Sequence, residues 1–326
     1  MKKFIAKRLA QMLVVFVAVS MFAFSIIYFS PGDPLYLYTS PAVSSYKMSD
    51  EQLDAMRESL GLNGNVAERY VSWAGKMLQG DWGLSVSNHQ PVKKQIMDKL
   101  PNTIGLMGAA LVLSILLSIP LGLLAGYYKN KWIDNIVSGI SYLGISLPAF
   151  WFGIMMIILF SLNLGWLPSS GMHAIGNTST GDMIKHAILP TLVLSVNNTA
   201  VFVRYIRANT IGQLSEEYVL TAEAKGDSQT KILFRHVLKN TLLPIITLMG
   251  MNLASLVCGS FIVESVFGWP GIGTFAMSAI GSRDYPVIMA YVMLSGFLLV
   301  VGNFIADLLY AFVDPRIKRG GASGGK

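Results

Sequence analysis

The amino-acid sequence predicts an all-α integral membrane protein with six transmembrane helices. Of its 326 residues 53% are hydrophobic and only 13% are charged, and the mean hydropathy is +0.53. A soluble domain of this length carries less apolar surface and more charge. The basic residues that give the formal charge of +7 lie at the ends of the apolar runs and form no single stripe, which argues against nucleic-acid binding.

Each predicted span is an apolar run of the length that a bilayer requires. A helix needs about 20 such residues to cross the hydrocarbon core. The first run follows basic residues, as a secretory signal would, but it is about twice as long as a signal core and so predicts an uncleaved anchor. The six runs are approximately Leu9–Ser30, Thr103–Tyr128, Ile133–Phe160, His186–Ile206, Leu242–Val263 and Val287–Val313.

The distribution of basic residues predicts that both termini are cytoplasmic. The two short outer loops would then carry only Lys185 and Arg283, whereas the inner loops and termini are rich in Lys and Arg. The stretch between the first two spans is too long to obey the charge rule. The expected division is residues 1–30 (amino terminus and first span), 31–102 (extracytoplasmic insertion), 103–313 (transmembrane core, with a cytoplasmic loop at 208–241) and 314–326 (cytoplasmic tail).

The insertion is expected to contain three short helices, over approximately Ser49–Gly61, Asn65–Gly80 and Pro91–Pro101. The first two begin with capping-box spacing, in which Ser or Asn is followed three positions later by Gln or Glu. Proline suits the first position of the third helix, which we expect to end before Pro101. Such an insertion either covers helix ends or offers a docking surface to an external partner, and the residues alone favour the first.

The loop between the fourth and fifth spans is polar and basic but has the pattern of helices. We expect one helix after Ser215 that ends at Gly226, and a second that is capped by Asp227 or Ser228. Such a pair fits the groove of a partner protein or an anionic lipid surface, and physical reasoning leaves these two alternatives even. The apolar face of the second helix would consist of Ile232, Leu233, Val237 and Leu238.

Several ordered segments resemble one family. "EYVLTAEAKG" (217–226) and "RHVLKNTLLP" (235–244) are similar to the cytoplasmic coupling loop of permease subunits in ATP-binding-cassette (ABC) importers of the peptide/opine/nickel group. "SPGDP" (30–34), "SLPAFWFGIMMIILFS" (146–161), "ESVFGWPGIG" (264–273) and "DPRIK" (314–318) resemble the same group in order. Leu220 occupies the place of the leading glutamate of the general importer loop, so no such glutamate is carried over.

The resemblance implies a type I ABC importer permease fold in a bacterial inner membrane. The implied function is a permease subunit of an ATP-driven importer for peptides or related small solutes, with dipeptides or oligopeptides ahead of nickel or another metal chelate. The implied partners are a second homologous permease, two ABC ATPase subunits and an extracytoplasmic solute-binding protein. The residues implied to contact the ATPase are Glu217, Tyr218, Thr221, Ala222, Ala224, Lys225 and Gly226.

The sequence predicts no catalytic residues and no metal site in this chain. Its four histidines are scattered and lack zinc-ligand spacing. "GGASGGK" (320–326) has the glycine and lysine spacing of a phosphate-binding loop but lacks the Ser or Thr and the strand-to-helix context, and "GIGTFA" (271–276) more plausibly turns the chain. We therefore expect ATP and Mg on the partner subunits, no cofactor on this chain and no enzymatic activity of its own.

Polar side chains within the spans are candidates for lining a translocation pathway because they are costly in lipid. The candidates are Asn197, Asn198, Asn252 and Asn303, with Arg204 at the inner end of the fourth span. For any single asparagine, an interhelical hydrogen bond is the favoured alternative. A self-sufficient secondary transporter or channel is the second function considered, but it predicts internal repeats and central charges that are not evident here.

Two further patterns concern helix geometry. Gly122 and Gly126 have the spacing of a small-residue pair that lets two helices approach closely. Pro120, Pro148 and Pro190 fall within predicted spans and could kink them.

Overall fold

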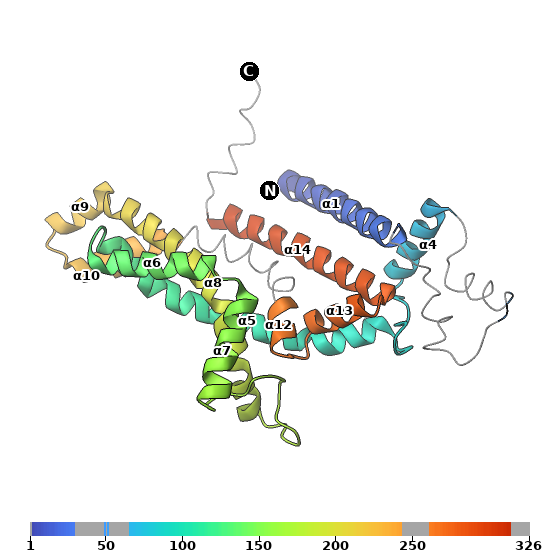
Figure 1. Cartoon of the computed structure of the whole chain (residues 1–326). Helices are drawn as coiled ribbons and strands as arrows, with labels where there is room; N and C mark the ends of the chain where they lie inside the picture. Colours follow the sequence, from blue (N-terminus) through green and yellow to red (C-terminus); the bar gives the residue numbers. More distant parts are fainter. Residues whose placement is uncertain (1, 30–48, 50, 52–64, 243–260, 314–326) are drawn as a thin grey trace. The chain divides into compact units, whose positions relative to one another are not determined.

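A computed structural model describes residues 2–29, 49, 51, 65–242 and 261–313, and these are helical apart from connecting segments and one isolated bridge between Leu84 and Pro91 (Figure 1). The chain divides into two compact units, which are described separately. One contains Pro101–Thr274 and Val301–Lys326, and the other contains Lys2–Leu100 and Phe275–Val300. The first helix of the insertion and the predicted span at Leu242–Val263 fall largely outside the described residues.

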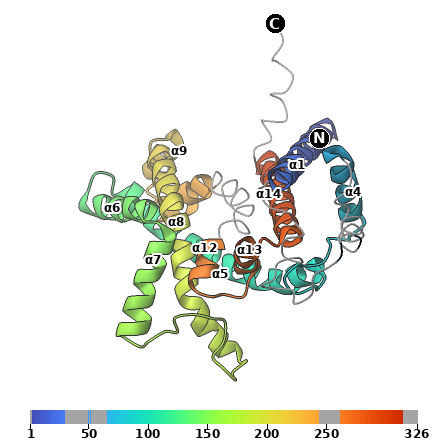
Figure 2. The same cartoon turned by 45° about the vertical axis from the view of Figure 1, so that its right-hand side comes forward.

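In the unit that begins at Lys2, α1 (Lys2–Tyr28) lies against α4 (Val66–Leu78). The Ser20 and Tyr70 hydroxyls are 2.7 Å apart, and the Phe24 ring lies 5.6 Å from that of Trp73. On the other side α1 runs beside the first half of α14 (Tyr285–Val313), where the rings of Phe16 and Phe297 are 6.2 Å apart (Figures 1 and 2). Aromatic contacts therefore hold this unit together.

The predicted second helix of the insertion is confirmed. Asn65 accepts a hydrogen bond from the Glu68 N–H at 2.9 Å, and the Glu68 carboxylate accepts one from the Asn65 N–H at 3.1 Å. The two bonds form the capping box that the spacing predicts. The helix ends at Leu78, and Gly80 follows with a φ of +85°.

The predicted end of the third helix is wrong. A helix does begin after Pro91, but α5 (Val92–Tyr127) continues for 36 residues and passes through Pro101 into the second predicted span. A proline inside a helix removes one backbone hydrogen bond and strains the preceding turn, and the long apolar run beyond Pro101 still favours helix.

The third predicted span is broken. α6 (Trp132–Ser146) is followed by α7 (Ala149–Met156) and the π-helix η1 (Ile157–Asn163), with a bend of 103° between the two halves. Pro148 is the cause, because proline disfavours helical conformation in the residue before it, and Leu147 is extended with a ψ of 124°. The kink expected at Pro148 is confirmed, and the apolar run predicted over Ile133–Phe160 is bent there. Both views show α7 turning away from α6 (Figures 1 and 2).

The close approach expected at Gly122 and Gly126 is confirmed. A Cβ atom at Gly122 would lie 2.6 Å from the Cβ of Ile206, and one at Gly126 would lie 2.6 Å from the Cβ of Thr210. Ile206 and Thr210 belong to α8 (Thr180–Leu214), so only glycine lets α5 and α8 meet here. α6 packs on the same helix, where a Cβ at Gly144 would lie 3.2 Å from Ala200.

By length and composition, four of the described helices can cross a membrane: α1 from Arg8, α5, α8 and α14 as far as Ile305. The bent pair of α6 with α7 and η1 passes the same test only when its halves are taken together. The chain is thus a multi-pass helical membrane protein.

Candidate functional site

The segment that the resemblance marks as a coupling loop, residues 215–241, folds beyond the end of α8. It consists of α9 (Glu217–Ala224), α10 (Gln229–Lys231) and the π-helix η2 (Ile232–Val237) (Figure 1). We call it the 215–241 segment. α9 has about two turns, one fewer than the sequence suggested.

Gly226 ends α9 as predicted, and the geometry explains why. Its N–H donates to the Glu223 carbonyl at 2.9 Å, and the Asp227 N–H donates to the Ala222 carbonyl at 3.1 Å. These two bonds form a Schellman motif, which requires a left-handed residue after the cap. Gly226 supplies it with a φ of +80°. Glycine adopts this conformation without the steric cost that a Cβ imposes.

The turn after Gly226 is held by polar side chains. Ser228 caps α10 by accepting a hydrogen bond from the Lys231 N–H. Asp227 pairs with the Lys231 ammonium and lies 3.5 Å from Nε2 of His236. The hydrogen bond from Lys231 lowers the pKa of Asp227, which lies outside the membrane-spanning helices, below its usual value, with a smaller contribution from His236.

The underside of the 215–241 segment is apolar and buried. Val219 and Ala222 of α9 contact a core built from η2, α8 and α5. Ala222 is only 6% exposed, so the structure places it in the interior of the chain and not on a surface open to a partner. The buried core residues are Leu111, Leu123, Phe202, Ile206, Val219, Ala222, Ile232, Leu233 and Val237.

The other residues with an implied ATPase contact are at least partly accessible. Tyr218 is half-buried, and its hydroxyl donates to the Gln213 side chain at 2.8 Å. The remaining five are exposed: Glu217, Thr221, Ala224, Lys225 and Gly226. The structure therefore brings six of the seven to an accessible face and places the seventh beneath it.

Two large apolar side chains also face outward in this segment, and the sequence analysis missed both as surface residues. Leu220 is 62% exposed and Phe234 is 59% exposed. Phe234 falls outside the apolar face predicted for its helix, and this was the available indication that it points away from the core. Exposed large apolar side chains of this kind suit contact with a partner protein or with lipid, the two alternatives that the sequence leaves open for this loop.

A buried ion pair ties α6 to α8 close to the 215–241 segment. Asp134 is buried and binds the Arg207 guanidinium through both carboxylate oxygens, with Nη2 at 2.7 Å from Oδ2. It also accepts hydrogen bonds from the Asn130 N–H at 2.8 Å and the Ser138 hydroxyl at 3.1 Å. The carboxylate is thus fully supplied with donors, as a buried charge requires. Nothing in the residue pattern indicates this pair, whose members are 73 positions apart.

The pathway candidates are less well defined. Asn197 is exposed and Asn198 half-buried on α8, and Asn303 is exposed on α14. None of these three side chains hydrogen-bonds to another of the described residues, so the interhelical bonds favoured for them are not seen there. Asn252 lies outside the described residues. Within the described part of the chain, no group of three or more His, Cys, Asp or Glu residues is arranged to hold a metal ion.

A second glycine-rich turn folds around a buried carboxylate. Between α12 (Phe261–Val266) and α13 (Ile272–Gly281) the chain turns at residues 267–271. Glu264 is 0% exposed and accepts hydrogen bonds from the Gly273 N–H at 2.7 Å, the Thr274 N–H at 3.2 Å and the Thr103 hydroxyl at 2.7 Å. We call residues 261–274 the Glu264 turn.

Comparison with known proteins places this architecture in a family. Residues 118–319 match the family described as "Binding-protein-dependent transport system inner membrane component", and residues 1–107 match "Binding-prot-dependent transport system membrane comp, N-term". The chain is 40% identical over 321 residues to the oligopeptide transport system permease protein AppB of Bacillus subtilis (strain 168), covering 98% of this chain and 100% of that protein. It is 34% identical over 318 residues to the glutathione transport system permease protein GsiC of Escherichia coli (strain K12), covering 98% and 99%.

The solved structures agree on the fold. An inward-facing structure of the MetNI methionine ABC transporter matches with a TM-score of 0.54 at 17% identity, over 67% of this chain and 96% of that chain. The apolar helices and these matches define a multi-pass component of a transport system in the inner membrane. The chain belongs to the binding-protein-dependent transport system inner membrane component family, as an ABC importer permease of the peptide group. Its relatives are transport permeases and not enzymes.

Proposed function

We propose that this chain is the permease subunit that forms half of the translocation pathway of an ATP-driven importer and receives force from separate ATPase subunits through the 215–241 segment. The observation that carries the proposal is the two-sided construction of α9. Its underside is fixed to the core by Val219 and Ala222, while its outer face presents Leu220 to solvent. A surface so anchored can move the helices beneath it when a partner moves it.

The cargo that we propose is a peptide. Two relatives that match nearly the whole chain are named for oligopeptide and for glutathione, which is itself a tripeptide. We favour dipeptides and oligopeptides, with glutathione, nickel or a metal chelate as other cargoes for this permease. Asn197, Asn198, Asn252 and Asn303 are the proposed pathway residues on this chain.

The topology that we propose has six spans with both termini in the cytoplasm. α6 together with α7 and η1 would form the third span, and residues 242–263 the fifth. The insertion over 31–102 would then be extracytoplasmic and accessible to a solute-binding protein. This orientation is supported by the basic residues near the inner ends of the spans and places the 215–241 segment in the cytoplasm.

The proposed mechanism needs no chemistry on this chain. Closure of two ATPase subunits around ATP and Mg would draw this 215–241 segment and that of a second, homologous permease together. The pathway would then change its accessible side, because a ligand shifts a conformational equilibrium by its different affinity for the two states. We propose that this chain binds no cofactor of its own.

Matched tryptophan substitutions test the proposal. Ala224→Trp and Gly226→Trp change the exposed end of α9, whereas Ala174→Trp changes an exposed alanine ahead of the opposite end of α8. In reconstituted vesicles with candidate ATPases, the first two should uncouple ATP hydrolysis from peptide uptake, while Ala174→Trp should leave coupling intact. Normal coupling in both α9 variants would overturn the docking assignment. Uptake by this chain alone, without ATP, would favour a secondary transporter or channel instead.

A further inference from the structure

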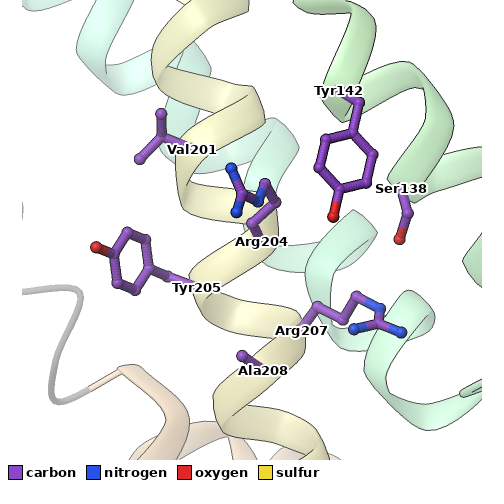
Figure 3. A pocket seen from close by; sticks show the side chains of 7 residues that line it. All are labelled: Ser138, Tyr142, Val201, Arg204, Tyr205, Arg207 and Ala208. Atoms are coloured by element: carbon purple, nitrogen blue, oxygen red, sulfur yellow. The ribbon is translucent and has the colours of Figure 1, made fainter. Parts of the chain in front are cut away.

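A cavity of about 550 Å³ opens between α6 and α8, within one unit of the chain. Ser138 and Tyr142 of α6 form one side. The other side is a stretch of α8 from Val201 to Ala208, with Arg204 between Tyr142 and Tyr205 (Figure 3). A volume of this size accommodates a small polar group together with part of an apolar tail.

The two arginines of this cavity differ in their partners. Arg207 is neutralised by the buried carboxylate of Asp134. Arg204 is exposed and lies over the Tyr142 ring at 5.2 Å, and among the described residues no carboxylate pairs with it. The Tyr142 and Tyr205 hydroxyls likewise make no hydrogen bond to another described residue. Among the described residues, the Arg204 charge in this cavity therefore has no carboxylate partner, and the Tyr142 side chain beside it keeps a free hydroxyl group.

The surface beside the cavity is apolar and carries the residues of a membrane interface. Trp132, at the start of α6, is 70% exposed, and Lys129 and Lys131 precede it. Tryptophan and lysine at the end of a span are typical of the headgroup region. The same helix exposes Ile136, Ile140 and Leu143 in one stripe, which lies about a third of a turn around α6 from Tyr142. A molecule bound in the cavity would therefore contact a cationic side chain, and the helix that forms one side of the cavity also carries an exposed apolar stripe.

We propose that this cavity binds the phosphate group of an anionic phospholipid, with Arg204 as its main ligand. The Arg204 guanidinium offers a planar fork that suits phosphate oxygens, and the Tyr142 hydroxyl on the facing helix can donate to the same group. The single uncompensated charge matches a phosphodiester monoanion, whereas a zwitterionic lipid brings a positive group to a positive site. The acyl chains lie on the exposed stripe of α6, which a soluble anion would leave uncovered.

The test is a lipid-retention experiment on the full chain, purified in the assembly in which it leaves the membrane. The protein is exchanged into mixed micelles that contain equal amounts of phosphatidylglycerol and phosphatidylcholine, and retained lipid is counted by native mass spectrometry. Wild type should retain phosphatidylglycerol in preference, and Arg204→Gln should lose about tenfold of that preference, since a hydrogen-bonded charge pair contributes this much. Arg204→Lys, which keeps the charge but loses the fork, should fall between the two.

Arg235→Gln is the matched control, because Arg235 is an equally exposed arginine on η2, away from the cavity. It should retain lipid as wild type does, and thermal unfolding should show that both glutamine variants stay folded. Undiminished preference for phosphatidylglycerol in Arg204→Gln, or equal retention of both lipids by wild type, overturns the proposal. Displacement of the lipid by millimolar inorganic phosphate or by a dipeptide assigns the cavity to a soluble anion and overturns it too. The measurement needs neither ATP nor transport, so it can fail while the proposed function stands.

Discussion

The 215–241 segment and the Glu264 turn use similar parts in opposite ways. Each has a short helix before and a helix after a glycine-containing turn, and an acidic side chain binds groups of that turn. Glu264 is completely buried and accepts hydrogen bonds from the Gly273 and Thr274 N–H groups and from the Thr103 hydroxyl of α5. Asp227 is partly exposed, and its partners among the described residues, Lys231 and His236, belong to its own segment.

The difference teaches how each segment is stabilised. A buried carboxylate must keep every donor, because an uncompensated buried charge costs several kcal/mol, so the Glu264 turn has one stable arrangement. Trp269 adds to it by donating to the Asn102 carbonyl at 3.1 Å. The 215–241 segment is held by apolar contacts from beneath, and its exposed ion pair contributes little. Its outer face is therefore free to serve a partner.

Glu264→Ala should have the largest effect on this comparison. Removal of the carboxylate leaves the Gly273 and Thr274 N–H groups and the Thr103 hydroxyl without their acceptor in a buried place. We expect a loss of roughly 3–5 kcal/mol in the free energy of unfolding. Thermal unfolding in detergent measures it, and Glu264→Gln, which keeps one acceptor oxygen, should lose less. A fully stable Glu264→Ala would show that the turn does not depend on its carboxylate.

The neighbouring pair Val219→Asp and Leu220→Asp should separate the two faces of α9. Val219 is buried, so an aspartate there should cost about 3 kcal/mol. Leu220 is exposed, so the same substitution should change the stability by less than about 0.5 kcal/mol but impair ATP-coupled uptake. Unfolding curves and coupled transport of both variants check this. Equal destabilisation by the two changes would remove the distinction between an anchored and an open face.

Gly226→Ala should have a smaller effect. Nothing lies within 4 Å of a Cβ atom built at this position, so the change introduces strain at a φ of +80° without a clash. We expect a loss of about 1 kcal/mol, measured as faster amide exchange in residues 222–228. Gly226→Asn should lose less stability than Gly226→Ala, because asparagine tolerates a positive φ better than alanine does. Gly273→Ala is the contrast, because its Cβ would lie 2.7 Å from the Phe261 Cα and should cost more.

Acidification should have the smallest effect of these changes, and it should destabilise the turn after α9. The folded-state pKa of Asp227 is lowered by Lys231, so the stabilisation of the turn is complete above about pH 4 and is lost as the pH falls through the lowered value. The measurement is the amide hydrogen-exchange rate at residues 226–231, corrected for the pH dependence of the intrinsic exchange rate. As the pH falls below about 4, this corrected rate should rise for wild type but not for Asp227→Asn. Equal profiles for the two proteins would exclude a contribution of this carboxylate.

Features encoded by neighbouring residues could be predicted from the sequence. The Asn65 capping box, the stop at Gly226 and the small-residue spacing of Gly122 and Gly126 each depend on a few positions and are confirmed. Pro148 predicts a kink but not the size of the 103° bend, because the apolar run continues on both sides and hydropathy carries no information on helix direction. The helix through Pro101 was missed for the converse reason, since a local helix breaker was outweighed by the apolar run that follows it.

Features that join distant positions could not be predicted. Glu264 was noted only as part of a motif, and its partner Thr103 lies 161 positions away. Asp134 and Arg207 looked like ordinary charges at the ends of spans. Ala222 was assigned to the contact surface because small residues suit close approach, and this holds equally for packing against η2 inside the chain. Only a folded chain separates these alternatives.

The glycine seam between α5 and α8 has a mechanical consequence. Ile206 and Thr210 occupy the space that side chains at Gly122 and Gly126 would fill, so the two helices are in close contact at both positions. We therefore expect α5 and α8 to move together as one unit. A displacement of the end of α8 would then displace α5 as well. A larger residue at Gly122 or Gly126 would separate the two helices and weaken this coupling, while each helix itself would stay intact.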